Sequence, residues 1–320
     1  MNRVLITGAS GFVGSRAGAL FARNFDEVVG TVRSHARVAR VPSGVKPVVT
    51  GELSGTTSWI QALRDVTHVV HIAARVHQSG AAARAAGAFQ SQNVAATAAL
   101  ARQAREAGVR RFVFMSSIAV NGAEREKPYT STDPPAPITE YGRSKLEAEL
   151  QLMDIAGAAM EVVIVRAPIV YGPRAPGNFA RLITLARLSR FVPLPLGGIE
   201  NRRSVLFVGN LASALLTCTL SNGLNPAVVF PSDAEVVSTT EIVTRVAAQL
   251  GFRPLLVPVS PRLLSRVASA VGVGPIAAHL TESLMVDTSE LTRLTGWRPR
   301  YSFDEGLSET LGRETLDQRV

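Results

Sequence analysis

Short apolar runs alternate with longer helix-type stretches through the first half of the chain. The runs are rich in Val, Ile and Phe, and Gly, Pro or polar residues bound them, as is typical of buried strands. They cover residues 4–7, 27–32, 67–72, 111–116 and 161–165. Between them, the alanine-rich residues 81–107 predict a helix, because alanine is the best helix former. This alternation predicts an α/β protein whose parallel sheet is covered by helices on both faces.

The pattern changes after Pro173. Pro, Gly and Arg crowd residues 173–178 and 192–204, and helical patterns follow at residues 208–220, 238–250 and 261–271. We therefore predict a doubly wound Rossmann domain over residues 1–172 and a smaller substrate-binding lobe over residues 173–320, with parts of 204–235 returning to the Rossmann sheet. Such a lobe would close a ligand site at the carboxyl ends of the strands.

A glycine-rich turn follows the first predicted strand. Residues 3–14, RVLITGASGFVG, place Gly8, Gly11 and Gly14 between a strand and a helix. Gly8 permits the turn, Gly11 lets the backbone approach a pyrophosphate, and Gly14 lets the helix pack close to the strand. The N–H groups at the start of the helix then face the anion. The spacing GxxGxxG differs from the commoner GxGxxG, yet its context predicts a dinucleotide site.

The end of the second strand bears on which dinucleotide binds. Residues 30–34 read GTVRS and carry no acid for a ribose 2′-hydroxyl, whereas Arg33 could pair with a 2′-phosphate. This favours NADP over NAD, although Arg33 is also one of many arginines that solvent alone could satisfy.

A tyrosine and a lysine stand four residues apart in the stretch YGRSK. On a helix, Tyr141 and Lys145 would share one face, and the ammonium should lower the pKa of the phenol. Ser116 and Ser117 end the strand at residues 111–116, where a hydroxyl can bind the oxygen of a carbonyl or alcohol. Without GxSxG or a histidine at matching spacing, a hydrolase triad is not indicated.

Composition limits the kinds of protein and of partner that the sequence allows. The 320 residues are 46 % hydrophobic and 18 % charged, as expected of a globular enzyme, and the net charge is +9. The arginines are scattered, so nucleotide phosphates are a simpler partner than nucleic acid, and an acidic membrane surface is a further hypothesis. No apolar run reaches the length of a membrane span and no signal peptide is evident, so we expect a cytoplasmic protein. Cys218 is the single cysteine, and no cluster of metal ligands is indicated.

Six ordered motifs carry a family resemblance. TGASGFVG, HIAA at 71–74, NVAAT at 93–97, MSSIAVNG, YGRSK and RAPIVYGP at 166–173 together resemble the extended short-chain dehydrogenase/reductase family, in its sugar-nucleotide epimerase and dehydratase branch. The C-terminal VDTSELTRLTGWRPRYSFDEGL is similar to the closing segment of those enzymes. The resemblance thus covers essentially the whole chain.

The resemblance implies roles for individual residues. Tyr141 would be the catalytic acid and base, Lys145 its partner and a ribose ligand, and Ser117 the hydroxyl beside the substrate oxygen, with Ser116 as the fallback. The cofactor, NADP or NAD, would contact Gly8, Gly11, Phe12, Val13, Gly14, Arg33, Glu52, Leu53, Ala73, Ala74, Asn93, Tyr141, Lys145 and Pro168. A UDP-sugar would contact Ser117, Asn178, Arg202 and Arg203. Adjacent side chains of a strand point to opposite faces, so one of the two arginines should reach the diphosphate.

The segment PLPLGGIENRRSVLFVGNLASAL is most similar to the bacterial branch that makes UDP-N-acetylquinovosamine for surface polysaccharide. This implies a 4-keto reductase acting on a UDP-4-keto-6-deoxy-N-acetylhexosamine. The alternatives are a UDP-glucose or UDP-N-acetylglucosamine 4-epimerase that uses the same residues, and an NAD(P)-sensing binding protein on the same fold. A dehydratase is disfavoured, because Ile118 and Ala119 occupy positions that would carry its acids. A homodimer formed by helices across a two-fold axis is compatible with such a chain.

Overall fold

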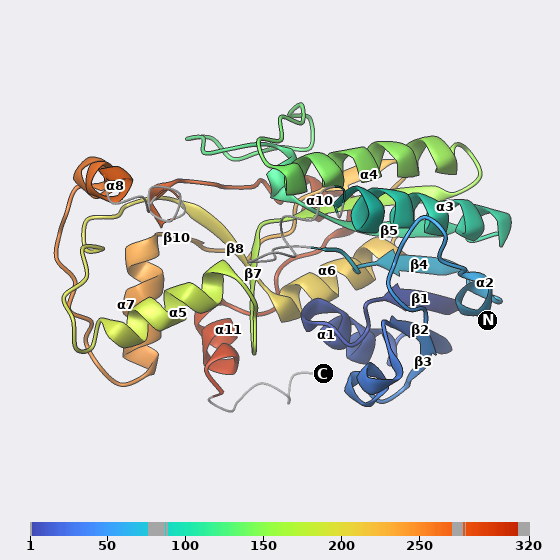
Figure 1. Ribbon diagram of the computed structural model, residues 1–320, viewed down its shortest axis with the longest axis horizontal. Helices are drawn as coiled ribbons and strands as arrows, with labels where there is room; N and C mark the ends of the chain where they lie inside the picture. The colour runs from blue at the N-terminus through green and yellow to red at the C-terminus, as the bar shows by residue number, and fades with distance from the viewer. Residues whose placement is uncertain (1, 76–86, 88, 271–277, 279, 313–320) are drawn as a thin grey trace.

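The computed structural model describes residues 2–75, 87, 89–270, 278 and 280–312, and it is built on a seven-stranded sheet (Figure 1). The strand order is β3-β2-β1-β4-β5-β6-β9, and every pairing is parallel. The chain therefore winds outward from β1 in both directions, and the switch point lies between β1 and β4, as predicted for a doubly wound fold. The strands are β1 (Arg3–Thr7), β2 (Glu27–Val32), β3 (Val45–Val49), β4 (His68–His71), β5 (Arg111–Ser117), β6 (Glu161–Ala167) and β9 (Ala227–Val229).

The five strands expected from the apolar runs are confirmed, with ends that agree within two residues. β3 was not predicted, because its sequence VKPVV contains a lysine and a proline. Both residues are tolerated because β3 is an edge strand of the sheet. Residues 204–235 divide between the sheets: β9 pairs with β6, whereas β8 (Arg203–Phe207) joins a smaller sheet.

Helices cover both faces of the large sheet. On one face lie α1 (Phe12–Phe21) and α6 (Val208–Leu220), and on the other α3 (Ala96–Glu106) and α4 (Glu140–Ala156) (Figure 1). Side chains of β1 alternate accordingly, because Val4 and Ile6 enter the core beside α1 and α6, whereas Leu5 enters the second core. A short helix, α2 (Ile60–Leu63), packs on that second core.

The described part of the helix predicted over residues 81–107 is confirmed after Gly87, which forms a turn with φ +78°. A π-helical segment, η3 (Gln90–Ala95), leads into α3, which ends at Glu106. Residues 81–86 and 88 of the predicted range lie outside the described residues.

The C-terminal half builds a smaller lobe at the left of Figure 1. Its three-stranded sheet has the order β10-β8-β7. The predicted range of α6 is confirmed, and those of α7 and α8 agree within a residue at each end. α5 was not predicted, because the preceding Pro/Gly-rich residues masked its start. The elements are β7 (Ile169–Tyr171), α5 (Asn178–Leu188), β8, β10 (Val236–Val237), α7 (Thr239–Gln249), α8 (Pro261–Ala270), α10 (Ser289–Thr295) and α11 (Phe303–Thr310).

Candidate functional site

The glycine turn after β1 has the shape that a pyrophosphate requires. Gly8 has φ +70°, and a Cβ on Gly14 would lie 2.1 Å from the Gly8 carbonyl oxygen. A Cβ on Gly8 would lie 3.3 Å from the Cα of Ala73, so the turn also packs against the segment after β4. Because α1 begins at Phe12, directly after Gly11, its first N–H groups border the turn. These residues fit a dinucleotide cofactor.

Other residues expected to contact the cofactor follow the strands of the same edge. Ala73 and Ala74 lie in the segment after β4, following Ile72, and Pro168 directly follows β6. Asn93 is buried in η3, where its Oδ1 accepts from the Arg75 N–H at 2.8 Å and its Nδ2 donates to Ser144 Oγ at 3.1 Å. Asn93 thereby ties the segment after β4 to α4. Phe12 and Val13 open α1, and Val13 is buried in the core.

Arg33 and Glu52 form an ion pair at the ends of β2 and β3. Their Nη1 and Oε1 atoms are 3.2 Å apart, and the side chains are 65 % and 61 % exposed. Glu52, three residues after the end of β3, thus places an acidic group beside Arg33, and Leu53 next to it packs on the core. The carboxylate offsets the Arg33 charge on which the NADP preference was based.

The catalytic candidates converge where β5 ends. Ser117 is the last residue of β5, and its hydroxyl hydrogen-bonds the phenol of Tyr141, near the start of α4. Lys145 follows one turn later, is buried, donates from Nζ to the Met115 carbonyl at 2.8 Å, and lies 4.4 Å from the centroid of the Phe114 ring. The end of β5 and the first turns of α4 thus carry the three residues, with Ser117 and Tyr141 in contact, and their catalytic roles stay a prediction.

The expected lowering of the Tyr141 pKa is wrong for this structure. Burial raises the pKa of Tyr141 to about 12, and the hydrogen bond from Ser117 opposes this only in part. Burial also lowers the pKa of Lys145 to about 8, and the charge of Glu149 counteracts that effect. Lys145 directs its ammonium at a backbone carbonyl, so desolvation of the phenol dominates. At neutral pH Tyr141 therefore holds its proton.

The fallback residue Ser116 belongs to a buried network behind the site. Its hydroxyl donates to Glu149, whose carboxylate also pairs with Arg166 at 2.6 Å. Arg166 donates in turn to Asn121 Oδ1 at 3.1 Å. The β5 side chains alternate, so Ser117 meets Tyr141 while Ser116 points into this network. Sequence reasoning missed Glu149, although its position four residues after Lys145 was a usable signal.

The buried ammonium of Lys145 should lower the free energy of unfolding at neutral pH. Because the folded pKa is about 8 and the ordinary value is 10.5, the folded state disfavours the charged form at neutral pH, and this cost disappears as pH rises from 8 to 10.5. Lys145→Met should therefore raise the free energy of unfolding by about 1–3 kcal/mol at pH 7. Urea denaturation at pH 7 and near pH 10.5 measures this. A gain that is equal at both pH values would contradict it.

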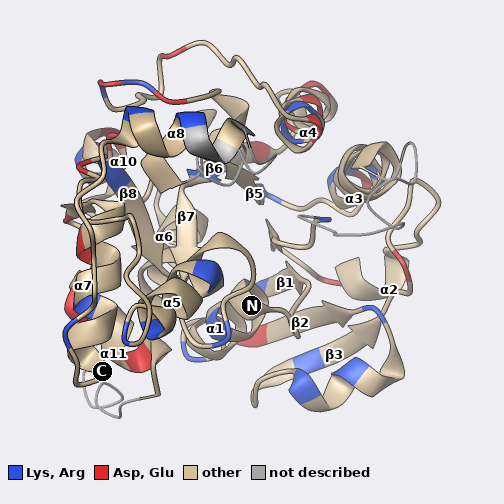
Figure 2. Cartoon of the chain, turned by 60° about the vertical axis from the view of Figure 1, so that its left-hand side comes forward, with Lys and Arg blue, Asp and Glu red and all other residues tan. Residues whose placement is uncertain are grey.

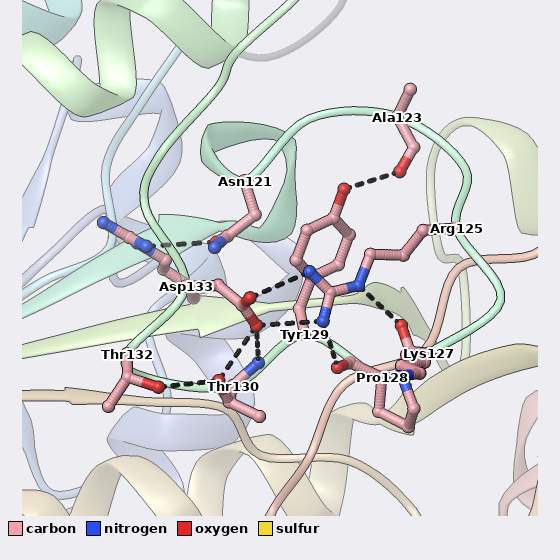
Figure 3. A network of polar contacts seen from close by, with 10 residues as sticks. Asn121, Ala123, Arg125, Lys127, Pro128, Tyr129, Thr130, Thr132 and Asp133 are labelled. Atoms are coloured by element: carbon pink, nitrogen blue, oxygen red, sulfur yellow. Dashed lines mark hydrogen bonds and ion pairs between the residues drawn. The ribbon is translucent and has the colours of Figure 1, made fainter.

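The strap, residues 122–138, connects the serine end of β5 to α4 (Figure 3). Arg125 holds it: the guanidinium donates to both carboxylate oxygens of Asp133 and to the Pro128 carbonyl, and it stacks 4.2 Å from the Tyr129 ring centroid. These hydrogen bonds lower the pKa of Asp133 to about 2. The backbone of Tyr129 bonds that of Met285 and Asp287 at 2.8 Å each. The strap therefore joins the Rossmann domain to the C-terminal lobe.

The residues expected to bind substrate lie in the lobe. Asn178 is the first residue of α5, Arg203 begins β8 and is partly buried, and Arg202 is exposed. Burial lowers the pKa of Arg203, while the charges of Glu282 and Glu124 raise it. The two arginines thus differ in burial, in keeping with side chains that alternate along a strand. Their contact with a substrate stays a prediction.

The described part of the chain lacks two features, a cluster of metal ligands and a membrane-spanning helix. No group of three or more potential metal ligands was found among those residues. Within the same part, no helix combines the length and the apolar character of a membrane span.

Known proteins match the chain closely. The family model "NAD dependent epimerase/dehydratase family" matches residues 4–228. A UDP-glucose 4-epimerase of Vibrio cholerae is 36 % identical over 312 residues, covering 96 % of this chain and 94 % of its own. Among solved structures, MoeE5 in complex with UDP-glucuronic acid and NAD has a TM-score of 0.77 at 25 % identity and covers 98 % of both chains.

The UDP-glucose 4-epimerase of Thermus thermophilus in complex with NAD has a TM-score of 0.75 at 26 % identity and covers 97 % of this chain and 98 % of its own. These matches favour an enzyme over a cofactor sensor and NAD over NADP. The family match, the sheet order and the convergence of Ser117, Tyr141 and Lys145 agree, and the chain belongs to the NAD dependent epimerase/dehydratase family of nucleotide-sugar enzymes.

Proposed function

We propose that this enzyme moves a hydride between a nicotinamide cofactor and C4 of a UDP-sugar, and that in its physiological direction it reduces a 4-keto group. The observation that carries the proposal is the hydrogen-bonded pair of Ser117 and a protonated Tyr141 at the carboxyl end of β5. The matched enzymes support the substrate class, because they are named as UDP-glucose 4-epimerases or contain a UDP-sugar and NAD.

Each side chain has a defined task in this proposal. When bound at the glycine turn after β1, reduced NAD would supply the hydride. Tyr141 gives its proton to the substrate O4, which gains negative charge as the hydride arrives at C4, so the product is the 4-alcohol. Ser117 donates a hydrogen bond to the same oxygen and holds it beside the phenol. A positively charged Lys145, one helical turn away, would stabilise the phenolate that remains, and the phenolate would then take up a proton from solvent before the next turnover.

The direction of reduction is supported by the likeness of one segment to a reductase branch. Tyr141 gives a proton in reduction and takes one in oxidation, so its protonated state at neutral pH serves the reductive step and is shared with the epimerase. The segment PLPLGGIENRRS, which resembles the quinovosamine-forming branch, supports the same substrate, a UDP-4-keto-6-deoxy-N-acetylhexosamine. The product would be UDP-N-acetylquinovosamine, a precursor for bacterial surface polysaccharide.

A second candidate, a UDP-sugar 4-epimerase, is favoured by a different observation. The Arg33–Glu52 ion pair offsets the positive charge that would select NADP, and an epimerase keeps NAD through oxidation and re-reduction of the same sugar. The relative that is 36 % identical also carries this name. Both candidates use Ser117, Tyr141 and Lys145, and they differ in whether the cofactor leaves with each turnover.

One experiment separates the two functions. The purified protein is denatured, and released nicotinamide cofactor is quantified by absorbance and mass spectrometry. The protein is also supplied with NADH and the 4-keto-6-deoxy UDP-sugar. Little retained cofactor with NADH consumption supports the reductase. Stoichiometric NAD with interconversion of UDP-glucose or UDP-N-acetylglucosamine and their C4 epimers supports the epimerase and overturns the reductase. No turnover of either substrate overturns both.

A further inference from the structure

Two short segments at the far end of the C-terminal lobe form one surface, which we call the lobe tip (residues 187–193 and 253–257). They lie side by side because Leu255 N–H donates to the Ser189 carbonyl at 2.7 Å and Leu194 N–H to the Leu255 carbonyl at 2.9 Å. Val257 N–H then donates to the Leu194 carbonyl at 2.8 Å. Figure 1 shows this end of the lobe, beyond α5 and α7, at the opposite end of the molecule from β3.

The lobe tip concentrates exposed apolar side chains. Of the eleven large hydrophobic residues that are exposed in the described structure, five lie in these two segments. The most exposed of the five is Phe191, at 75 %. Single exposed apolar residues are common on soluble proteins, but a group on one surface marks a contact site. The five are Leu188, Phe191, Val192, Leu255 and Val257.

The charge of the tip has one sign. No acidic residue occurs in residues 162–199 or in residues 242–281, which together contain nine arginines. Arg187, Arg190 and Arg253 of the tip are exposed, and none forms an ion pair with a described acidic residue. Figure 2 shows basic residues on α5 and α8 of this lobe. Arg190 lies 5.5 Å from the Phe191 ring centroid and 5.6 Å from that of Phe252.

We propose that the lobe tip docks on the surface of an anionic lipid bilayer. Exposed aromatic and aliphatic side chains that alternate with unpaired arginines suit the headgroup region, where rings and aliphatic chains enter the acyl boundary and guanidinium groups meet phosphates. The stems of the arginines can also lie along apolar surface while their charges stay in the polar layer. The surface would hold the enzyme at the membrane through this contact alone.

A second copy of the chain fits the lobe tip less well than an anionic bilayer does. A two-fold axis through the tip would set Arg187, Arg190 and Arg253 opposite the same three arginines. These segments contain no acidic residue that could offset the repulsion, and like charges across an interface disfavour association. An anionic bilayer instead supplies the missing negative charge over the whole surface.

Sedimentation with lipid vesicles tests the proposal on the full-length protein. Vesicles of phosphatidylcholine with phosphatidylglycerol should bind it at low salt, whereas pure phosphatidylcholine should bind it weakly. Removing two charges with Arg187→Gln and Arg253→Gln should lower the partition coefficient by roughly 25-fold, because each arginine contributes about fivefold near such a surface. Phe191→Ser should lower it by roughly tenfold through lost apolar insertion.

Matched controls come from the other end of the molecule. Arg37→Gln with Arg40→Gln removes the same charge from exposed positions of η1 (His35–Arg40), and Ile60→Ser removes an apolar side chain that is 76 % exposed. Binding that is absent, that is equal for neutral vesicles, or that falls equally in the controls overturns the proposal. The proposal is also overturned if the protein does not bind vesicles and instead self-associates in a way that Phe191→Ser abolishes. A second copy of the chain would then cover the lobe tip.

Discussion

Replacement of Tyr141 by phenylalanine should lower kcat by about a hundredfold to ten-thousandfold, the range in which a positioned acid contributes to proton transfer. The variant loses the proton donor and the partner of the Ser117 hydroxyl, yet keeps the buried ring that packs 6.2 Å from Phe89. Tyr141 belongs to α4, whereas the glycine turn that would bind the pyrophosphate follows β1. We therefore expect the affinity for the cofactor to change far less than kcat. Steady-state kinetics with cofactor titration by fluorescence measures both.

Tyr301→Phe is the matched control for this prediction. It removes a phenol from a ring that packs on Phe207 in the C-terminal part of the fold, away from the end of β5. Its kcat should equal that of the unmodified protein. If Tyr141→Phe retains most of its activity, another group must supply the proton, and the assignment of Tyr141 fails whichever direction the reaction takes.

Replacement of Glu149 by alanine should lower the free energy of unfolding by about 3–5 kcal/mol, because it leaves the Arg166 guanidinium buried without its counter-ion. The two side chains are 3 % and 6 % exposed, so water cannot take the place of the carboxylate. The Ser116 hydroxyl also loses its acceptor. Urea denaturation followed by circular dichroism gives the change.

Two comparisons identify the cause of this loss. Glu149→Leu combined with Arg166→Met removes both charges from the core and should regain much of the stability, because an apolar pair of similar size needs no counter-ion. Glu290→Ala breaks the surface pair with Arg293, where solvent already screens both groups, and should produce no measurable change. Glu149→Ala as stable as the unmodified protein would contradict a structural role for the buried pair.

The strands and helices of the large sheet were predictable because their burial follows simple periods. β2 and α6 match their predicted ranges, since an apolar strand between polar turns and a largely buried apolar stretch of helical length each leave a clear pattern. β3 was not predictable from such a pattern, because an edge strand accepts Lys46 and Pro47. The start of α5 was hidden for a related reason, since proline and glycine signal a turn even where a helix begins directly after it.

The catalytic candidates could be predicted from spacing, but their electrostatics could not. A spacing of four residues in a helix places Tyr141 and Lys145 on one face. It does not show which group accepts a hydrogen bond from the ammonium. Only the fold reveals that the Met115 carbonyl does so, and that burial governs the pKa of the phenol. The Glu149–Arg166 pair joins α4 to β6, and the Arg33–Glu52 pair joins the ends of two strands, so both depend on contacts between separate elements.

The strap has a consequence for the order in which the protein matures during synthesis. The bonds between Tyr129 and residues 285 and 287 cannot form until those residues have left the ribosome, long after Tyr129 itself. At about 5–20 residues per second, this delay is roughly 10–30 seconds. The sheet and α4 can assemble within that time, because their strands and helices precede residue 230. A nascent chain therefore possesses the catalytic candidates well before the last part of the chain fastens the segment that leads into their helix.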